Sequence, residues 1–139
     1  MQDRRTHPRI PSRLKAVAFY REGNKEYNCE IANISETGLC LEFLGAKCVS
    51  FNKGDLLIVQ FCDRFIYGDR LENPRFILRA IVRHIEKRGK DVFAGCYVSN
   101  KTFLDYVKKK GLLAYEDSML KAERNIHIGV LPCSYQQQE

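Results

Sequence analysis

The sequence predicts a mainly β fold in which six short strands form an antiparallel barrel or sandwich, with helical segments at the C-terminal end. Six apolar stretches of strand-like composition are separated by tight turns, and no helical periodicity lies between them. After Asn100 the apolar residues change to a helical spacing. The chain has 139 residues, of which 45% are hydrophobic, so it can bury the core of one domain without disulfides or metal.

The strands follow a basic N-terminal segment. Pro8 and Pro11 exclude a helix there, so we expect residues 1–13 to form a flexible, extended arm. Residues 39–43 alternate between apolar and more polar side chains, the pattern of a half-buried strand. The predicted strands cover residues 15–20, 26–35, 38–44, 56–62, 75–85 and 92–99, and residues 63–74 between them are expected to form a charged loop.

Two helical segments are expected after the strands. Asn100 suits the N-cap of a helix over residues 101–110 that places Phe103 and Val107 against the barrel. Gly111 suits the C-cap of this helix.

A second helix is expected over residues 112–124, with Leu112, Tyr115 and Met119 forming an apolar stripe that packs on the barrel. The chain therefore divides into an arm (1–13), a barrel with C-terminal helices (14–124) and a disordered tail (125–139).

Composition limits the possible functions. The six cysteines contain no CxxC pair, and most lie in apolar segments, so we expect buried free thiols in a reducing cytoplasm. No cysteine pair is at ligand spacing from a histidine, so neither zinc nor another cofactor is expected. The N-terminus has no apolar stretch, and no segment is long enough to span a bilayer, so we expect no membrane insertion. No catalytic constellation is visible, and we expect no enzyme.

Two short motifs carry the functional prediction. The first places arginines on the arm, where their guanidinium groups can bind phosphate oxygens and the guanine edge or stack on purines. The second ends a strand with an amide and a hydroxyl that can hydrogen-bond a base edge, followed by a glycine that allows close approach or positive φ. The candidate ligand-binding residues are Arg4, Arg5, Arg9, Asn33, Ser35 and Gly38.

The strand that carries the second motif needs one irregularity. Asn33 and Ser35 are two residues apart and share a face, with Ile34 toward the core. In a regular strand Ile31 would share the face of Asn33, which a β-bulge between them or a position at the barrel rim would reconcile.

The spacing Arg5-x-x-x-Arg9 followed by Asn33-x-Ser35-x-x-Gly38 resembles the two-part signature of PilZ domains, bacterial receptors for cyclic di-GMP. This resemblance implies a six-stranded antiparallel β-barrel with a C-terminal helix. It implies that Arg5 and Arg9 clamp phosphate and guanine, while the second motif holds another guanine edge. Arg4 implies an intercalated pair of ligands per protomer. A stacking side chain on the strand over residues 79–85 is also implied, for which Arg83 and His84 are the nearest candidates.

The resemblance further implies an effector whose arm becomes ordered on ligand binding and which regulates an unidentified protein in motility, pilus or exopolysaccharide machinery. Two alternatives remain open. The net charge of +6 permits a small barrel that binds single-stranded nucleic acid, although the aromatic residues lie mainly in apolar runs rather than beside cations. The second alternative is a PilZ-like adaptor that binds only protein.

Overall fold

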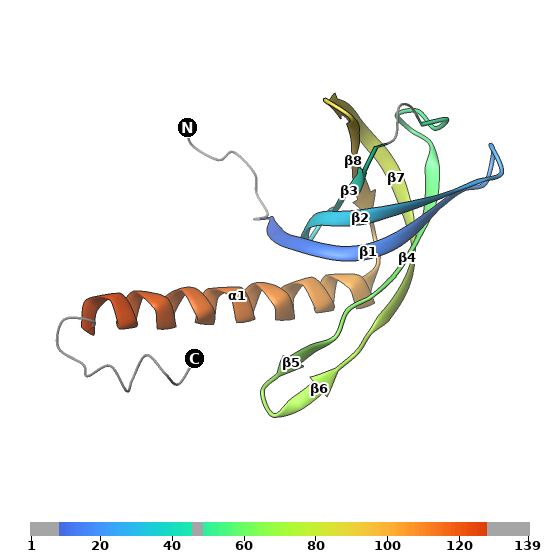
Figure 1. The fold of residues 1–139 in the computed structure, drawn as a ribbon. Helices are drawn as coiled ribbons and strands as arrows, with labels where there is room; N and C mark the ends of the chain where they lie inside the picture. The colour runs from blue at the N-terminus through green and yellow to red at the C-terminus, as the bar shows by residue number, and fades with distance from the viewer. Residues whose placement is uncertain (1–8, 46–48, 128–139) are drawn as a thin grey trace.

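The computed structural model describes residues 9–45 and 49–127. Six antiparallel strands form a closed barrel in the order β1-β2-β3-β8-β7-β4 (Figure 1). The strands are β1 (Ile10–Tyr20), β2 (Lys25–Ser35), β3 (Gly38–Phe43), β4 (Leu56–Cys62), β7 (Arg75–Arg88) and β8 (Asp91–Val98). The predicted six-stranded antiparallel barrel is therefore confirmed.

Alternation of side chains along the strands builds the barrel core. In β7 the inward residues are apolar and buried, whereas the outward residues are exposed. Burying a large apolar side chain contributes about 1.5–3 kcal/mol, so a one-residue slip of this strand would be strongly unfavourable. The inward set is Phe76, Leu78, Ala80 and Val82, and the outward set is Arg75, Ile77, Arg79, Ile81 and Arg83.

Aromatic side chains close both ends of the barrel. Phe43 and Phe51 lie at one end with their ring centroids 5.4 Å apart. At the other end the ring of Phe76 lies 4.8 Å from that of Tyr106 and 5.9 Å from that of Phe103, two residues of the C-terminal helix. This second cluster seats the helix on the barrel.

One continuous helix, α1 (Lys101–His127), replaces the two predicted segments. Its N-cap is Asn100, as predicted: the backbone N–H of Phe103 donates to Asn100 Oδ1 at 2.9 Å. Gly111 was expected to end the first helix and does not. A glycine inside a helix costs only about 0.5–1 kcal/mol, less than the helical pattern on both sides gains. The helix also includes residues 125–127, the first three of the predicted tail.

The apolar stripe Leu112, Tyr115 and Met119 is exposed, so the prediction that it packs on the barrel is wrong. The reason is helix geometry. Leu112 follows the buried Phe103 by nine residues, which is two and a half turns at about 3.6 residues per turn. The stripe therefore lies on the side of α1 that faces away from the barrel.

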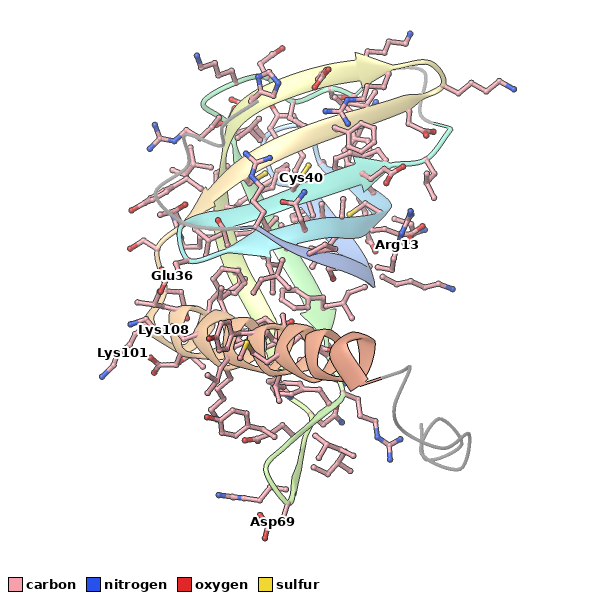
Figure 2. The ribbon with its side chains drawn as sticks, turned by 90° about the vertical axis from the view of Figure 1, so that its left-hand side faces the viewer. Arg13, Glu36, Cys40, Asp69, Lys101 and Lys108 are labelled. Carbon is pink, nitrogen blue, oxygen red and sulfur yellow. The ribbon has the colours of Figure 1, made fainter. Side chains whose placement is uncertain are left out.

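A small hairpin replaces most of the predicted loop over residues 63–74. Strands β5 (Phe65–Tyr67) and β6 (Arg70–Glu72) pair around Gly68, which has φ +67°. Figure 1 shows the hairpin beside α1, and Figure 2 labels Asp69 at its tip. Three-residue strands give too short a pattern to be recognised in a sequence.

The hairpin is fastened to α1 through a buried carboxylate. Asp63 Oδ2 accepts a hydrogen bond from Tyr106 Oη at 2.9 Å and lies 3.1 Å from Lys110 Nζ. Lys109 Nζ reaches Glu72 Oε1 at 3.1 Å from the other side of the hairpin. The base of the hairpin and the middle of α1 therefore form one packed unit.

Strand ends and cysteines differ from the predictions in detail. Strand β1 begins at Ile10, so residues 10–13 of the predicted arm are already part of the sheet.

The expectation of buried free thiols is met by Cys29 and Cys96, whereas Cys62 is exposed because it points outward from β4. Within residues 9–45 and 49–127, no helix is long and apolar enough to cross a membrane.

Candidate functional site

A groove of about 520 Å³ lies on the outside of the barrel across β2, β3, β8 and β7. It brings together Arg9, Asn33, Ser35 and Gly38, four of the six predicted site residues. The other two, Arg4 and Arg5, lie outside the described residues. Cys40, on the outer face of β3 in Figure 2, also lines this groove.

The floor of the groove is a glycine between two aromatic rings. Phe93, Gly95 and Tyr97 alternate along β8 and line the groove. Gly95 is level with Cys40 of β3 and with His84 of β7. Because Gly95 has no side chain, the surface is open between the two rings.

An arginine lies over each of these rings. The Cζ atom of Arg83 is 5.1 Å from the centroid of the Tyr97 ring, and that of Arg88 is 4.4 Å from the centroid of Phe93. These are cation–π distances, and they leave planar cationic groups at the edge of the groove. The groove therefore combines positive charge with flat surfaces.

A β-bulge in β7 explains the position of Arg83. Val82 pairs with Cys96 and His84 pairs with Gly95, so one extra residue is inserted on β7. As a result the alternation along β7 is interrupted, and the neighbours Arg83 and His84 are both exposed. Bulges re-aim side chains in this way and are frequent near functional sites.

One carboxylate faces the cations of the groove. Glu86 Oε2 lies 2.9 Å from Arg88 Nη2 and 3.7 Å from His84 Nε2. The hydrogen bond from Arg88 lowers the pKa of Glu86 below its ordinary value. Glu86 is therefore ionised at neutral pH and offsets part of the charge of Arg88, whereas Arg9 and Arg83 add to the positive field.

A second bulge presents the polar motif residues. The register between β2 and β3 shifts between Ile31 and Asn33, which is the first of the two explanations that the sequence left open. Ile31 and Ile34 are buried in the core, while Asn33 lines the groove. The predicted outward position of Asn33 is therefore confirmed.

Ser35 organises the turn that follows β2. Its Oγ lies 3.3 Å from Thr37 Oγ1 and 3.5 Å from the carbonyl oxygen of Gly38. The serine is almost fully buried, so its hydroxyl both shapes the turn and lies at the groove.

Gly38 is required by packing against β8. A methyl group on Gly38 would lie 1.9 Å from the carbonyl oxygen of Cys96 and 3.2 Å from Cα of Tyr97. Gly38 does not have a positive φ. Of the two reasons that the sequence suggested, close approach and positive φ, only the first applies, and the group that approaches is the β8 backbone.

Cys40 is a half-buried thiol within the groove. Burial raises its pKa, and the charges of Arg9 and Arg88 oppose this shift. Arg9 and Arg88 come from different parts of the chain, and both act on the thiol of Cys40. The groove therefore collects positive charge from separate segments.

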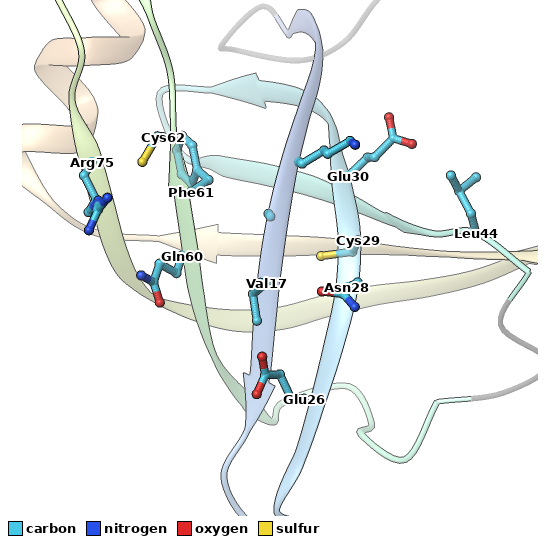
Figure 3. A pocket seen from close by; sticks show the side chains of 12 residues that line it. Val17, Glu26, Asn28, Cys29, Glu30, Leu44, Gln60, Phe61, Cys62 and Arg75 are labelled. Atoms are coloured by element: carbon cyan, nitrogen blue, oxygen red, sulfur yellow. The ribbon is translucent and has the colours of Figure 1, made fainter.

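A larger hollow of about 870 Å³ lies across β1, β2 and β4 (Figure 3). It contains none of the predicted site residues, and its charges are mixed, with Lys15 and Arg75 alongside Glu26 and Glu30. Binding an anionic, planar ligand requires convergent cations and flat surfaces. The smaller groove meets this requirement better.

The arginine and aromatic pairs of the groove were not predicted as a set. The sequence named Arg83 only as a candidate for stacking, and it did not indicate Arg88, Phe93 or Tyr97. The available signal is the pattern Phe93-x-Gly95-x-Tyr97, a glycine on the outer face between two aromatics. Among the described residues, no three His, Cys, Asp or Glu side chains are grouped to hold a metal ion.

Comparisons with known proteins agree with this architecture. The sequence model of the PilZ domain matches residues 3–103. None of the curated proteins compared with this chain matches it. Solved structures with a similar fold include the PilZ domain with c-di-GMP of YcgR from Escherichia coli, with a TM-score of 0.62 and 15% identity over 88% of this chain and 99% of that one.

Two longer proteins also resemble the chain. The Bacillus subtilis inhibitor of motility, MotI/DgrA, gives a TM-score of 0.58 and 20% identity over 80% of this chain. The K. pneumonia MrkH–c-di-GMP complex gives a TM-score of 0.56 and 15% identity over 90% of this chain. The chain spans 53% of the length of the first and 56% of the second.

Proposed function

Because the chain belongs to the PilZ domain family, we propose that it is a receptor for cyclic di-GMP and binds this nucleotide in the groove that contains Arg9, Asn33, Ser35 and Gly38. The observation that carries the proposal is the convergence of these residues, which are distant in sequence, on one surface with two arginine–aromatic pairs. Two proteins of similar fold are described with c-di-GMP.

The ligand has two phosphates and two guanine bases, and each matches part of the groove. Arg83, whose Cζ lies over the ring of Tyr97, provides a stacking plane for a guanine. Arg9 faces the groove and provides charge for a phosphate. Asn33 hydrogen-bonds a base edge through its amide.

The arm completes the site in this proposal. Arg5 binds phosphate or guanine from the opposite side, and Arg4 stacks on a second guanine, so that two intercalated ligands bind per protomer. Isothermal titration calorimetry measures this ratio directly. A value of two ligands per chain supports the role of Arg4, and a value of one contradicts it.

Ligand binding orders the arm and creates a surface that a protein target recognises in the cytoplasm. One relative of similar fold is described as an inhibitor of motility, which supports motility machinery as a target class; pilus and exopolysaccharide machinery are the others. The protein binds its ligand without converting it. The division of the chain into an arm, a barrel and a C-terminal part belongs to the same proposal, with residues 10–13 in β1 and residues 125–127 in α1.

The test is a calorimetric titration of the full chain with cyclic di-GMP, with GTP as a nucleotide control. Arg9→Ala and Arg83→Ala should each weaken binding about tenfold to a hundredfold, the effect of losing a good arginine contact worth about 1–3 kcal/mol. Arg79→Ala is the matched control, because Arg79 is exposed on the same strand outside the groove. Wild-type affinity in both groove variants would refute the site.

Single-stranded nucleic acid is the second candidate. The sequence argued against it because aromatics appeared separate from cations, but Tyr97 and Phe93 each lie beside an arginine. Aromatic and cationic groups in one groove also bind single strands. An oligonucleotide series distinguishes the two: affinity that rises with length and falls steeply with salt, with no preference for cyclic di-GMP, would favour nucleic acid.

A further inference from the structure

Helix α1 extends well beyond the barrel that holds its beginning. Phe103, Tyr106 and Val107 are buried, whereas none of the described side chains of α1 after Val107 is buried. The 27 residues of the helix give a length of about 40 Å. Figure 1 shows its second half projecting to one side of the barrel.

The projecting half carries large apolar side chains on one face. Leu112, Tyr115 and Met119 are 45%, 63% and 52% exposed. Their spacing of three and then four residues is that of the a and d positions of a heptad. In the sequence, Ala122 and Ile126 continue the same spacing to the end of the helix.

A helix of this kind is not stable by itself in water. Helical stability in proteins comes mainly from packing of an apolar face, and short isolated helices are marginal. Because Leu112 lies half a helix circumference away from Phe103, the barrel to which α1 is attached cannot cover this face. Another helix is the complementary surface for such a stripe.

We propose that the stripe formed by Leu112, Tyr115 and Met119 packs against the same stripe of a second copy of this chain, with the two helices antiparallel. Charge selects both the partner and the direction. Lys108 is exposed one turn before Leu112 on the same face and points away from the barrel in Figure 2. A parallel pair would place Lys108 beside the equivalent lysine, which is unfavourable.

An antiparallel pair avoids this repulsion. With Leu112 level with Met119 of the second copy, the helices cross near Tyr115. Position 108 is then level with position 123, which is a glutamate in the sequence. Lys108 at the start of the stripe is therefore level with Glu123 near its end, as opposite charges are at the flanks of coiled coils.

Sedimentation velocity of the full chain over a range of concentrations tests the association. The wild type is expected to form a reversible dimer, and Leu112→Glu with Met119→Glu is expected to be monomeric. Ala114→Glu, which adds charge at an exposed position off the stripe, is the control and should leave the dimer intact. A monomeric wild type, or a dimer unaffected by the stripe substitutions, would overturn the proposal.

Cysteine cross-linking tests the direction in a background where Cys48, Cys62 and Cys133 are changed to serine. Tyr115→Cys should form a disulfide-linked dimer on oxidation, because position 115 is close to the crossing point. Leu112→Cys should not, because two copies of position 112 are then far apart. The reverse result would refute the antiparallel arrangement. Circular dichroism of each variant checks that the barrel remains folded.

This inference does not depend on the nucleotide. Loss of cyclic di-GMP binding in Arg9→Ala with an intact dimer, and loss of the dimer with intact nucleotide binding in the stripe variant, would separate the two proposals.

Discussion

The carbonyl oxygen of Cys96 occupies the space that a side chain on Gly38 would need: a methyl group there would lie 1.9 Å from it. Gly38→Ala should therefore force β3 and β8 apart and lower the free energy of unfolding by at least about 1–3 kcal/mol, the usual cost of overpacking. Urea unfolding followed by circular dichroism measures this. An alanine variant as stable as the wild type would contradict this packing role.

Gly95 gives the opposite expectation. A methyl group on Gly95 would lie 3.6 Å from His84 Cβ, an ordinary contact, so Gly95→Ala should fold with little change in stability. The methyl would, however, fill the floor of the groove between Phe93 and Tyr97 and should weaken binding of cyclic di-GMP by about tenfold, or about 1.4 kcal/mol. Calorimetry and urea unfolding on the same variant separate the two effects. Unchanged affinity would place the ligand elsewhere.

Gly111→Ala should stabilise the protein. Gly111 lies inside α1, and a methyl group there would meet Ile10 Cδ1 at 3.6 Å, without a clash. Alanine is favoured over glycine in a helix by about 0.5–1 kcal/mol. Thermal unfolding should show a higher Tm. A lower Tm would mean that the helix ends or bends at this residue, as the sequence suggested.

The buried carboxylate of Asp63 makes Tyr106→Phe destabilising. Tyr106 Oη donates to Asp63 Oδ2, and removal of the hydroxyl leaves the carboxylate with Lys110 as its partner. Losing a buried hydrogen bond to a charged group costs about 1–3 kcal/mol, measurable by urea unfolding. Tyr97→Phe is the control because Tyr97 is exposed on the outer face of β8. An equal effect in both variants would exclude a specific contribution from Asp63.

Burial raises the pKa of the Cys29 and Cys96 thiols to about 12. Both remain protonated in the folded protein between their ordinary pKa of about 9 and 12, whereas the unfolded chain loses these protons. The unfolded state thus binds fewer protons, and stability should fall as pH rises through this range. Urea unfolding at pH 8 and pH 10.5 checks the direction, and Cys29→Ala should reduce the pH dependence. A dependence that Cys29→Ala leaves unchanged would refute this origin.

The barrel could be predicted because it depends on local alternation. Strands such as β7 show a two-residue period along their first nine residues, and this pattern requires no knowledge of neighbours. The β5–β6 hairpin could not be predicted, because its stability comes from contacts of Asp63 and Glu72 with a helix more than thirty residues away.

The site was partly predictable for the same reason. Asn33, Ser35 and Gly38 form a short motif within one segment. The pair of Arg83 and Tyr97 depends on the register of β7 against β8 and on an inserted residue in β7. A bulge changes which residues face outward without leaving a clear mark in the sequence, so this pair could be identified only in the folded chain.

The contact between Ile10 and the Gly111 position links the start of β1 to α1. Ile10 follows the groove residue Arg9 in the chain, and its side chain rests on α1. Only one peptide bond therefore separates Arg9 from a residue that contacts the helix. A single side chain, that of Ile10, thus connects the segment that enters the groove to the middle of α1.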